Sequence, residues 1–268
     1  MKTSAHDDVP RLSGGSLAAL FRCSLRLAGR LGDEQTGRRG ADPSLRLWTA
    51  LTDVLRAAHD HAWDLSVPLE DAVSDAQLAE PPGILSVEES ALYRSSLAAY
   101  LDAFGDDERA AIHPRAGDAL RRRVQTNPPF DLTGRADLLF AFEERSPLIR
   151  RISLRGSPQR NGDGDPSVAD MSLAVLLGLD RGPAPNDVVL RSETLWLASD
   201  ATVTESRVTG ADLSRFRRRL YIEIEASMTA PSPSPGWWCT TCERLSNCPA
   251  VSSDPPHVVL ARLRNTAP

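Results

Sequence analysis

WWCTTCERLSNCP, the stretch from Trp237 to Pro249, holds three of the four cysteines of the 268-residue chain. The spacing is C-x2-C-x5-C, and two residues between the first pair let a turn bring both sulfurs to one metal ion or cluster. The fourth cysteine, Cys23, lies near the other end of the chain. Four thiolates are the usual ligand set of an iron–sulfur cluster or a structural zinc site. We therefore expect Cys23, Cys239, Cys242 and Cys248 to join the two ends of the chain and close the fold.

The sequence around these cysteines leaves two other interpretations open. They could be unligated buried thiols, or they could form disulfides in a secreted chain. The proline-rich run Pro231–Gly236 favours an extended lead-in to the cysteine loop, because proline is excluded from helix interiors and central strands. The polar, acidic segment Met1–Asp8 lacks the pattern of a signal peptide. We expect a cytoplasmic protein, where clustered cysteines more often bind metal than form disulfides.

Composition sets bounds on the function. The 36 acidic residues outnumber the 31 basic ones, and the net charge of −5 gives no overall nucleic-acid footprint. The hydrophobic fraction is ordinary for a globular domain, and no apolar run is long enough to span a membrane, so no membrane partner is expected. The one lysine is Lys2. A mechanism that needs a lysine inside the fold is therefore excluded.

Hydrophobic periodicity and capping residues predict helices first and strands later. The first helix is expected within 12–23, capped by Ser13 or Ser16, and a Ser86–Glu89 capping box opens another. The remaining helices are predicted at 44–64, 114–123, 169–179 and 212–226, with the capping-box helix ending near 104. Strands are predicted at 132–142 and 148–154, as a hairpin, and at 188–190 and 193–197.

This order predicts an α/β layer architecture with an N-terminal helical part. Residues 1–12 are expected to be a flexible tail and residues 13–254 a single domain. Within that domain we expect a helical part at about 13–125, a sheet core at about 126–226 and the cysteine-rich loop at 231–249. Residues 255–268 are expected to be a C-terminal tail.

Three features together resemble a known family. They are the segment from Leu12 to Cys23, the stretch Gly134-Arg135-Ala136-Asp137-Leu138-Leu139, and the terminal C-x2-C-x5-C motif. This combination is similar to the RecB-like branch of the PD-(D/E)XK nuclease superfamily, including CRISPR-associated exonucleases with an iron–sulfur cluster. The resemblance implies a restriction-endonuclease-like central mixed sheet flanked by helices and a C-terminal cysteine lock. It also implies a [4Fe-4S] cluster on the four cysteines, with zinc as the alternative, and DNA as a partner.

The resemblance gives Asp137 the role of a Mg²⁺ ligand in metal-assisted phosphodiester hydrolysis. Ser153 stands where the family has its second carboxylate, and Arg155 stands where it has a lysine. Serine alone is a poor Mg²⁺ ligand, and arginine does not release a proton to act as a base. We therefore expect an impaired catalytic centre, with DNA binding or a place beside a helicase or other DNA-processing subunit as the remaining role.

Arginine-rich runs are the remaining functional signal. They lie at 121–123, 150–151 and 215–219, with Arg155 between the last two. Arg155, Arg215 and Arg218 are the predicted DNA contacts, because such clusters can follow a phosphate backbone. The alternatives are a solvated face, or ion pairs with nearby Glu223 and Glu225.

Two other functions stay open at this point. An active Mg²⁺-dependent DNA exonuclease would join Asp137 to Asp163 or Asp165, with Arg155 as an electrostatic stabiliser. A zinc-stabilised interaction module would have no DNA role. The resembled family also has a histidine on its second helix, and this chain has no clear counterpart of it. His59 and His61 lie further along the predicted helix 44–64, where a histidine more often has a structural role or is exposed.

Overall fold

The computed structural model describes residues 9–23, 43–106, 120–127, 129–134, 138–142, 145–154, 166–197 and 201–229, together with Cys239 and Cys248. The helices in these ranges are α1 (Gly14–Arg22), α3 (Pro43–Leu65), α4 (Leu69–Asp75), α5 (Val87–Phe104), α6 (Val168–Leu176) and α7 (Gly210–Thr229). The strands are β1 (Arg11–Ser13), β2 (Leu120–Val124), β3 (Phe130–Gly134), β4 (Leu138–Phe142), β5 (Arg145–Ser153), β6 (Val188–Trp196) and β7 (Thr202–Thr209).

The strands form two mixed sheets. Sheet A has the order β1-β3-β2, with β1 parallel and β2 antiparallel to β3. Sheet B has the order β4-β5-β6-β7, in which β5 and β6 are parallel and the two outer pairs are antiparallel. The parallel pair is joined through α6, as a parallel connection requires a crossover. The expectation of a mixed α/β fold is therefore confirmed.

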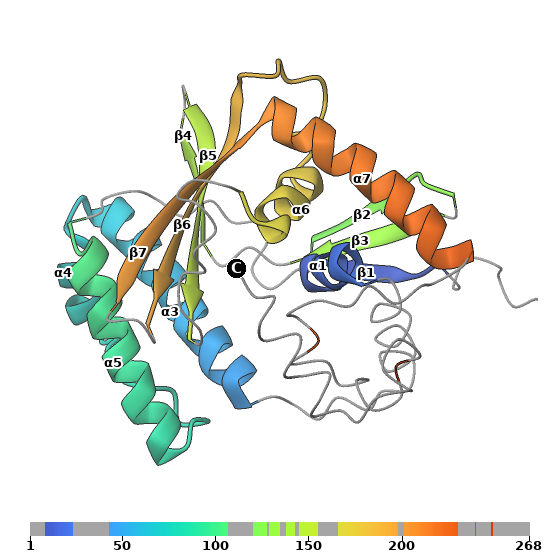
Figure 1. The fold of residues 1–268 in the computed structure, drawn as a ribbon. Coiled ribbons are helices and arrows are strands. Elements are labelled where there is room, and N and C mark those ends of the chain that lie inside the picture. The colour runs from blue at the N-terminus through green and yellow to red at the C-terminus, as the bar shows by residue number, and fades with distance from the viewer. Residues whose placement is uncertain are drawn as a thin grey trace, which may run out of the picture.

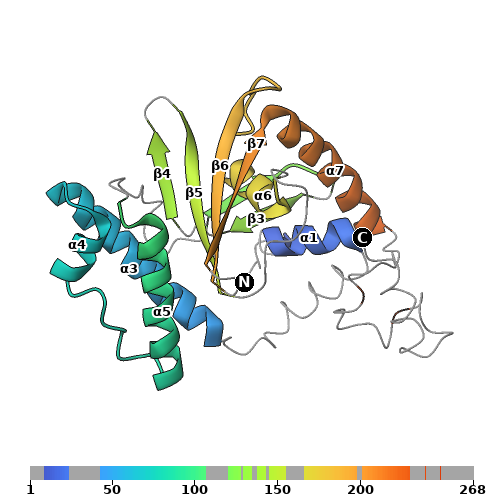
Figure 2. The same ribbon diagram turned by 60° about the vertical axis from the view of Figure 1, so that its left-hand side comes forward.

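Helices cover both faces of sheet B (Figures 1 and 2). One face packs on α3, α4 and α5 through a cluster that includes Leu138, Phe140 and Leu148 of the sheet. The other face, with Ile149 and Leu190, shares a second cluster with α1, α6, α7 and sheet A. Side chains alternate across a strand, so neighbouring residues of β5 enter different clusters.

Local sequence explains where several helices begin. Ser86 and Glu89 form the predicted capping box of α5, and Ser13 Oγ accepts a hydrogen bond from Ser16 N at 3.2 Å at the start of α1. Thr209 and Asp212 bond reciprocally at the start of α7, with Thr209 N donating to Asp212 Oδ2 at 2.9 Å. These contacts satisfy backbone N–H groups that have no partner inside a helix.

The structure corrects several element predictions. Residues 120–123 belong to strand β2, not to a helix, and residues 188–196 form one strand where two were predicted. The predicted strand 132–142 divides between β3 and β4, which lie in different sheets, so only β4 and β5 form the hairpin. The predicted tail also ends early, because Arg11 and Leu12 lie in β1. Strand β7 and helix α4 had no counterpart in the prediction.

None of the described helices combines the length and apolar character that a membrane span requires.

Candidate functional site

The end of β5 carries polar side chains on the face of sheet B that α6 covers. Ile149 of β5 lies in the α6-side core, and side chains two and four residues further along a strand share its face. Arg151 and Ser153 therefore project toward α6. Ser153 is the last residue of β5, and its carbonyl accepts a hydrogen bond from Leu197 N at 3.0 Å. This strand end is the position to which the family resemblance assigns catalytic chemistry.

Asp170 of α6 is the partner that the structure gives Arg151. Its Oδ1 lies 2.7 Å from Arg151 Nη1, and its side chain is nearly fully buried. That contact is an ion pair by distance, although Oδ1 lacks a hydrogen bond of good geometry. Oδ2 accepts hydrogen bonds from Ser167 N at 3.0 Å, Ser167 Oγ at 2.7 Å and Ser206 Oγ at 3.3 Å. The carboxylate is thus engaged by α6, β5 and β7 together.

The described strand residues on this face are neutral apart from Arg151. Parity with Leu190 places Ser192 and Thr194 of β6 on the same side, and parity with Val208 places Thr204 and Ser206 of β7 there. Within the described ranges, these strand positions contribute no carboxylate. What they offer chemically is one guanidinium, one engaged aspartate from α6 and a set of hydroxyl groups.

The opposite face of sheet B holds a buried polar network. The Arg150 side chain is fully buried and donates to Glu193 Oε2 through Nε at 2.9 Å and Nη2 at 2.8 Å, across the directly paired strands β5 and β6. Its Nη1 donates to the Tyr100 hydroxyl at 2.9 Å, and its guanidinium stacks 3.5 Å from the Phe104 ring centre. His59 Nε2 lies 2.8 Å from the same hydroxyl. These buried groups tie α3 and α5 to the sheet, which fits a structural role for His59.

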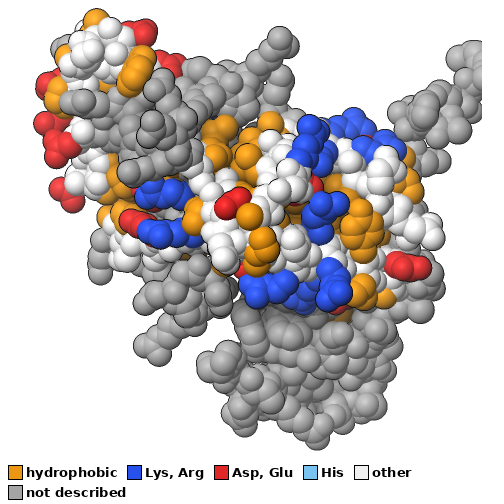
Figure 3. All heavy atoms as spheres, turned by 90° about the horizontal axis from the view of Figure 1, so that it is seen from above, with side chains coloured by type: hydrophobic (Ala, Val, Ile, Leu, Met, Phe, Trp, Pro, Cys, Tyr) orange, Lys and Arg blue, Asp and Glu red, His pale blue; other side chains and the backbone are white. Residues whose placement is uncertain are grey.

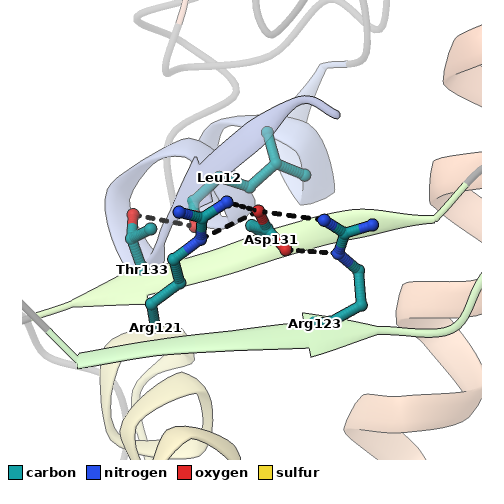
Figure 4. A network of polar contacts seen from close by, with 5 residues as sticks. All are labelled: Leu12, Arg121, Arg123, Asp131 and Thr133. Atoms are coloured by element: carbon teal, nitrogen blue, oxygen red, sulfur yellow. Dashed lines mark hydrogen bonds and ion pairs between the residues drawn. The ribbon is translucent and has the colours of Figure 1, made fainter. Parts of the chain in front are cut away.

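A second network lies on sheet A. Asp131 of β3 is 1% exposed and accepts hydrogen bonds from Arg121 and Arg123 of β2 (Figure 4). Burial favours the neutral acid, but the hydrogen bonds from Arg123 and Arg121 outweigh it and hold the pKa of Asp131 below its usual value. Arg122 points to the other side of β2, where it contacts Asp180 and the Val175 carbonyl. The arginine run therefore splits between two aspartates.

Helix α7 exposes arginine side chains to solvent and also contacts α1. Arg218 is exposed and has no ion pair within the described residues, while the 79%-exposed side chain of Arg215 pairs with Asp212. Arg219 Nη2 donates to the Phe21 carbonyl at 2.8 Å, and its guanidinium lies 4.4 Å from the Phe21 ring centre. Of the ion pairs predicted for this helix, the structure shows Arg219 with Glu223 at 3.9 Å.

The cysteines are described in part. Cys23 directly follows α1 and is half-buried, Cys239 is buried, and Cys248 is half-buried. None of these three forms a disulfide. Their thiol chemistry suits an iron–sulfur cluster or zinc, but the described residues bring no three His, Cys, Asp or Glu side chains together as a metal site. Cys242 lies outside the described residues, so the four-cysteine site stays a prediction.

The other predicted site residues separate into two groups. Asp137, Arg155, Asp163 and Asp165 lie outside the described residues. Ser153 is at the end of β5, and Arg215 and Arg218 are on the exposed side of α7. The Arg151–Asp170 pair was not predicted from the sequence, although the S-x-x-D spacing of Ser167 and Asp170 is a helix-start signal that the sequence contains.

Comparison with known proteins adds little to this picture. No protein-family model matches the chain, and no curated protein matches its sequence. A solved structure titled "Crystal structure of SSO0001" is similar at 14% identity over 93% of this chain and 89% of that one, with a TM-score of 0.43. A likeness at that level identifies neither fold family nor function.

Proposed function

We propose that the chain is a RecB-like nuclease-family protein with a four-cysteine [4Fe-4S] cluster, and that it binds DNA without cleaving it. The proposal that the protein does not cleave DNA is supported by the Arg151–Asp170 ion pair near the end of β5. A Mg²⁺-dependent hydrolase holds its metal with free carboxylates at such a strand end. Here the carboxylate from α6 is already engaged by a guanidinium and two serines.

The architecture is compatible with the family part of the proposal. A hairpin, β4-β5, leads through α6 to β6, which lies parallel to β5, and helices cover both faces of this sheet. A central mixed sheet flanked by helices is what the resemblance implies. The cluster itself would need Cys23, Cys239, Cys242 and Cys248, and when bound it would supply a cross-link between the chain ends.

Exposed arginines support the DNA part. Arginine side chains gather in several groups on the face shown in Figure 3, separated by hydrophobic and neutral side chains. On α7, Arg215 and Arg218 lie on the outer side of the helix, one turn apart. Guanidinium groups placed in this way suit phosphate contacts, which contribute affinity without reading sequence.

The test is DNA binding and cleavage by the whole chain in the presence of Mg²⁺ or Mn²⁺. We expect salt-dependent binding, intact DNA, and a salt slope lower by about 2 in R215Q/R218Q, because each lost phosphate contact removes about 1. The matched control is R46Q/R94Q, which removes two exposed arginines from α3 and α5. Equal losses in both double variants would refute the α7 contact. Metal-dependent cleavage that D137A abolishes would instead establish the exonuclease, and absence of any DNA binding would favour the zinc-stabilised module.

A further inference from the structure

Three arginines surround one aspartate on the side of sheet A that faces away from the core. Leu12 and Leu132 are paired across β1 and β3, and both side chains enter the core cluster. The preceding pair, Arg11 and Asp131, therefore projects to the opposite side. Arg123 is paired with Asp131 from β2, and Arg121 lies two residues before it. We call Arg11, Arg121, Arg123 and Asp131 the arginine face.

The charges of the arginine face are unequally exposed. The Asp131 side chain is 2% exposed, whereas those of Arg121 and Arg123 are 51% and 38% exposed. Arg11 is also exposed and has no ion pair within the described residues. Three guanidinium groups against one covered carboxylate leave a net positive charge, and it is the cations that solvent reaches.

Asp131 also orients the two β2 arginines. Arg121 and Arg123 each contact it through Nε and Nη2, and neither Nη1 makes a hydrogen bond within the described part of the chain. A guanidinium has five N–H donors in a rigid planar fork, so donors remain for a second anion. Figure 4 shows both groups reaching over β3 to the same carboxylate. The Asp131 carboxylate thus fixes the orientation of both guanidinium groups in the absence of a ligand.

The spacing favours a linear polyanion. Arg121 and Arg123 lie two residues apart on β2, and Arg11 lies on the other side of β3, so three cations lie side by side for successive phosphates of one chain. The face is built from three strands and its arginine side chains reach solvent, which suits a chain of phosphates that lies across it. A small anion would be better held in an enclosed site.

We propose that the arginine face is a second DNA-backbone site, separate from α7, in which Asp131 positions Arg121 and Arg123 and Arg11 adds a third phosphate contact. The proposal rests on the DNA-binding function proposed above. Asp131 then has two opposing effects. Its carboxylate orients the guanidinium groups of Arg121 and Arg123, and its negative charge weakens the attraction of the face for phosphate.

This double role gives opposite effects for two single substitutions. R11Q removes a contact and leaves the Asp131 pairs intact, so DNA affinity should fall about two- to fivefold, with a salt slope lower by about 1. D131N keeps an acceptor oxygen but removes the negative charge, so affinity should rise about two- to fivefold. If the arginine face does not contact DNA, neither the loss of Arg11 nor the change at Asp131 should alter DNA affinity beyond the change seen in the control R94Q.

The experiment is a salt titration of binding to a labelled single-stranded oligonucleotide and to the corresponding duplex. The parent, R11Q, D131N, R215Q/R218Q and the control R94Q are compared, with a thermal melt of each. Weaker R11Q and tighter D131N binding support the site, and the better-held oligonucleotide tells whether single strands or duplexes are preferred. If D131N does not fold, the DNA affinity of R11Q alone decides whether the arginine face binds DNA.

The inference is overturned if R11Q binds DNA like the parent while R215Q/R218Q binds less tightly, and the proposed function then stands. If the parent protein shows no salt-dependent DNA binding, the proposed function fails and the arginine face fails with it.

Discussion

At the scale of single residues, the buried charged side chains are the ones whose ion pairs hold elements of the fold together. Asp131, Asp170, Asp180 and Arg150 are all buried, and each has a partner of opposite charge on another element. A buried ion without a partner is strongly unfavourable. These residues therefore connect separate elements of the fold, and substitutions that break their ion pairs should lower the free energy of unfolding.

The Asp131 pairs predict a pH dependence. Because the folded-state pKa of Asp131 is lowered, its contribution to stability is complete above the ordinary aspartate pKa of about 3.9 and is lost as pH falls through the folded-state value. The unfolding free energy of the parent should exceed that of D131N by a constant amount from neutral pH to about pH 4, and by less below that. Urea unfolding at a series of pH values measures this. A difference that stays constant into the acid range would contradict it.

Replacing Gly210 by alanine should lower the stability of the fold. Gly210 is buried at the start of α7, and a Cβ there would overlap the Ala184 carbonyl oxygen, which is backbone and has no rotamer to change. We expect G210A to lower the free energy of unfolding by about 1–3 kcal/mol. The control is G83A, because a Cβ at Gly83 meets nothing within 4 Å. Equal unfolding free energies for G210A and G83A would show that the loop before β6 adjusts.

At the scale of elements, α7 holds the end of α1 that precedes Cys23. Phe21 packs edge-on against Phe216 with ring centres 5.7 Å apart, and Arg219 bonds the Phe21 carbonyl. Carbonyls in the last turn of a helix have no partner inside the helix, so Arg219 stabilises that end. Helices α1 and α7, which are far apart in the sequence, are thus held together by contacts between described residues.

This contact can be tested by hydrogen exchange. R219Q should increase amide exchange in the last turn of α1 and leave α5 unchanged, because only α1 loses its external partner. R218Q, the exposed neighbour, is the matched control. Unchanged exchange in α1 would mean that packing of Phe21 on Phe216 is sufficient.

Elements also show what could be predicted from sequence. The α5 capping box is local, and both of its residues were identified correctly. Strand β2 was misread as a helix because its three arginines lack an apolar period; their alternation between Asp131 and Asp180 is visible only once β3 and the turn after α6 are in place. The Arg151–Asp170 pair was missed for the same reason, since β5 and α6 meet only in the fold.

At the scale of the whole molecule, we propose that one four-cysteine cluster closes a RecB-like fold. Helix α1 ends directly before Cys23 and packs on α7, which places one predicted ligand beside a helix from the C-terminal part of the chain. The arrangement of Cys239, Cys242 and Cys248 relative to Cys23 decides whether the family resemblance extends to its cofactor.

The most direct measurement is the iron, acid-labile sulfide and zinc content of the parent and of C23A, both purified without oxygen. We predict about four iron and four sulfide per parent chain and their loss in C23A, because a [4Fe-4S] cluster needs four cysteine ligands. Zinc in place of iron, or a stable chain that contains neither metal, would rule out the [4Fe-4S] cluster and favour the interaction module.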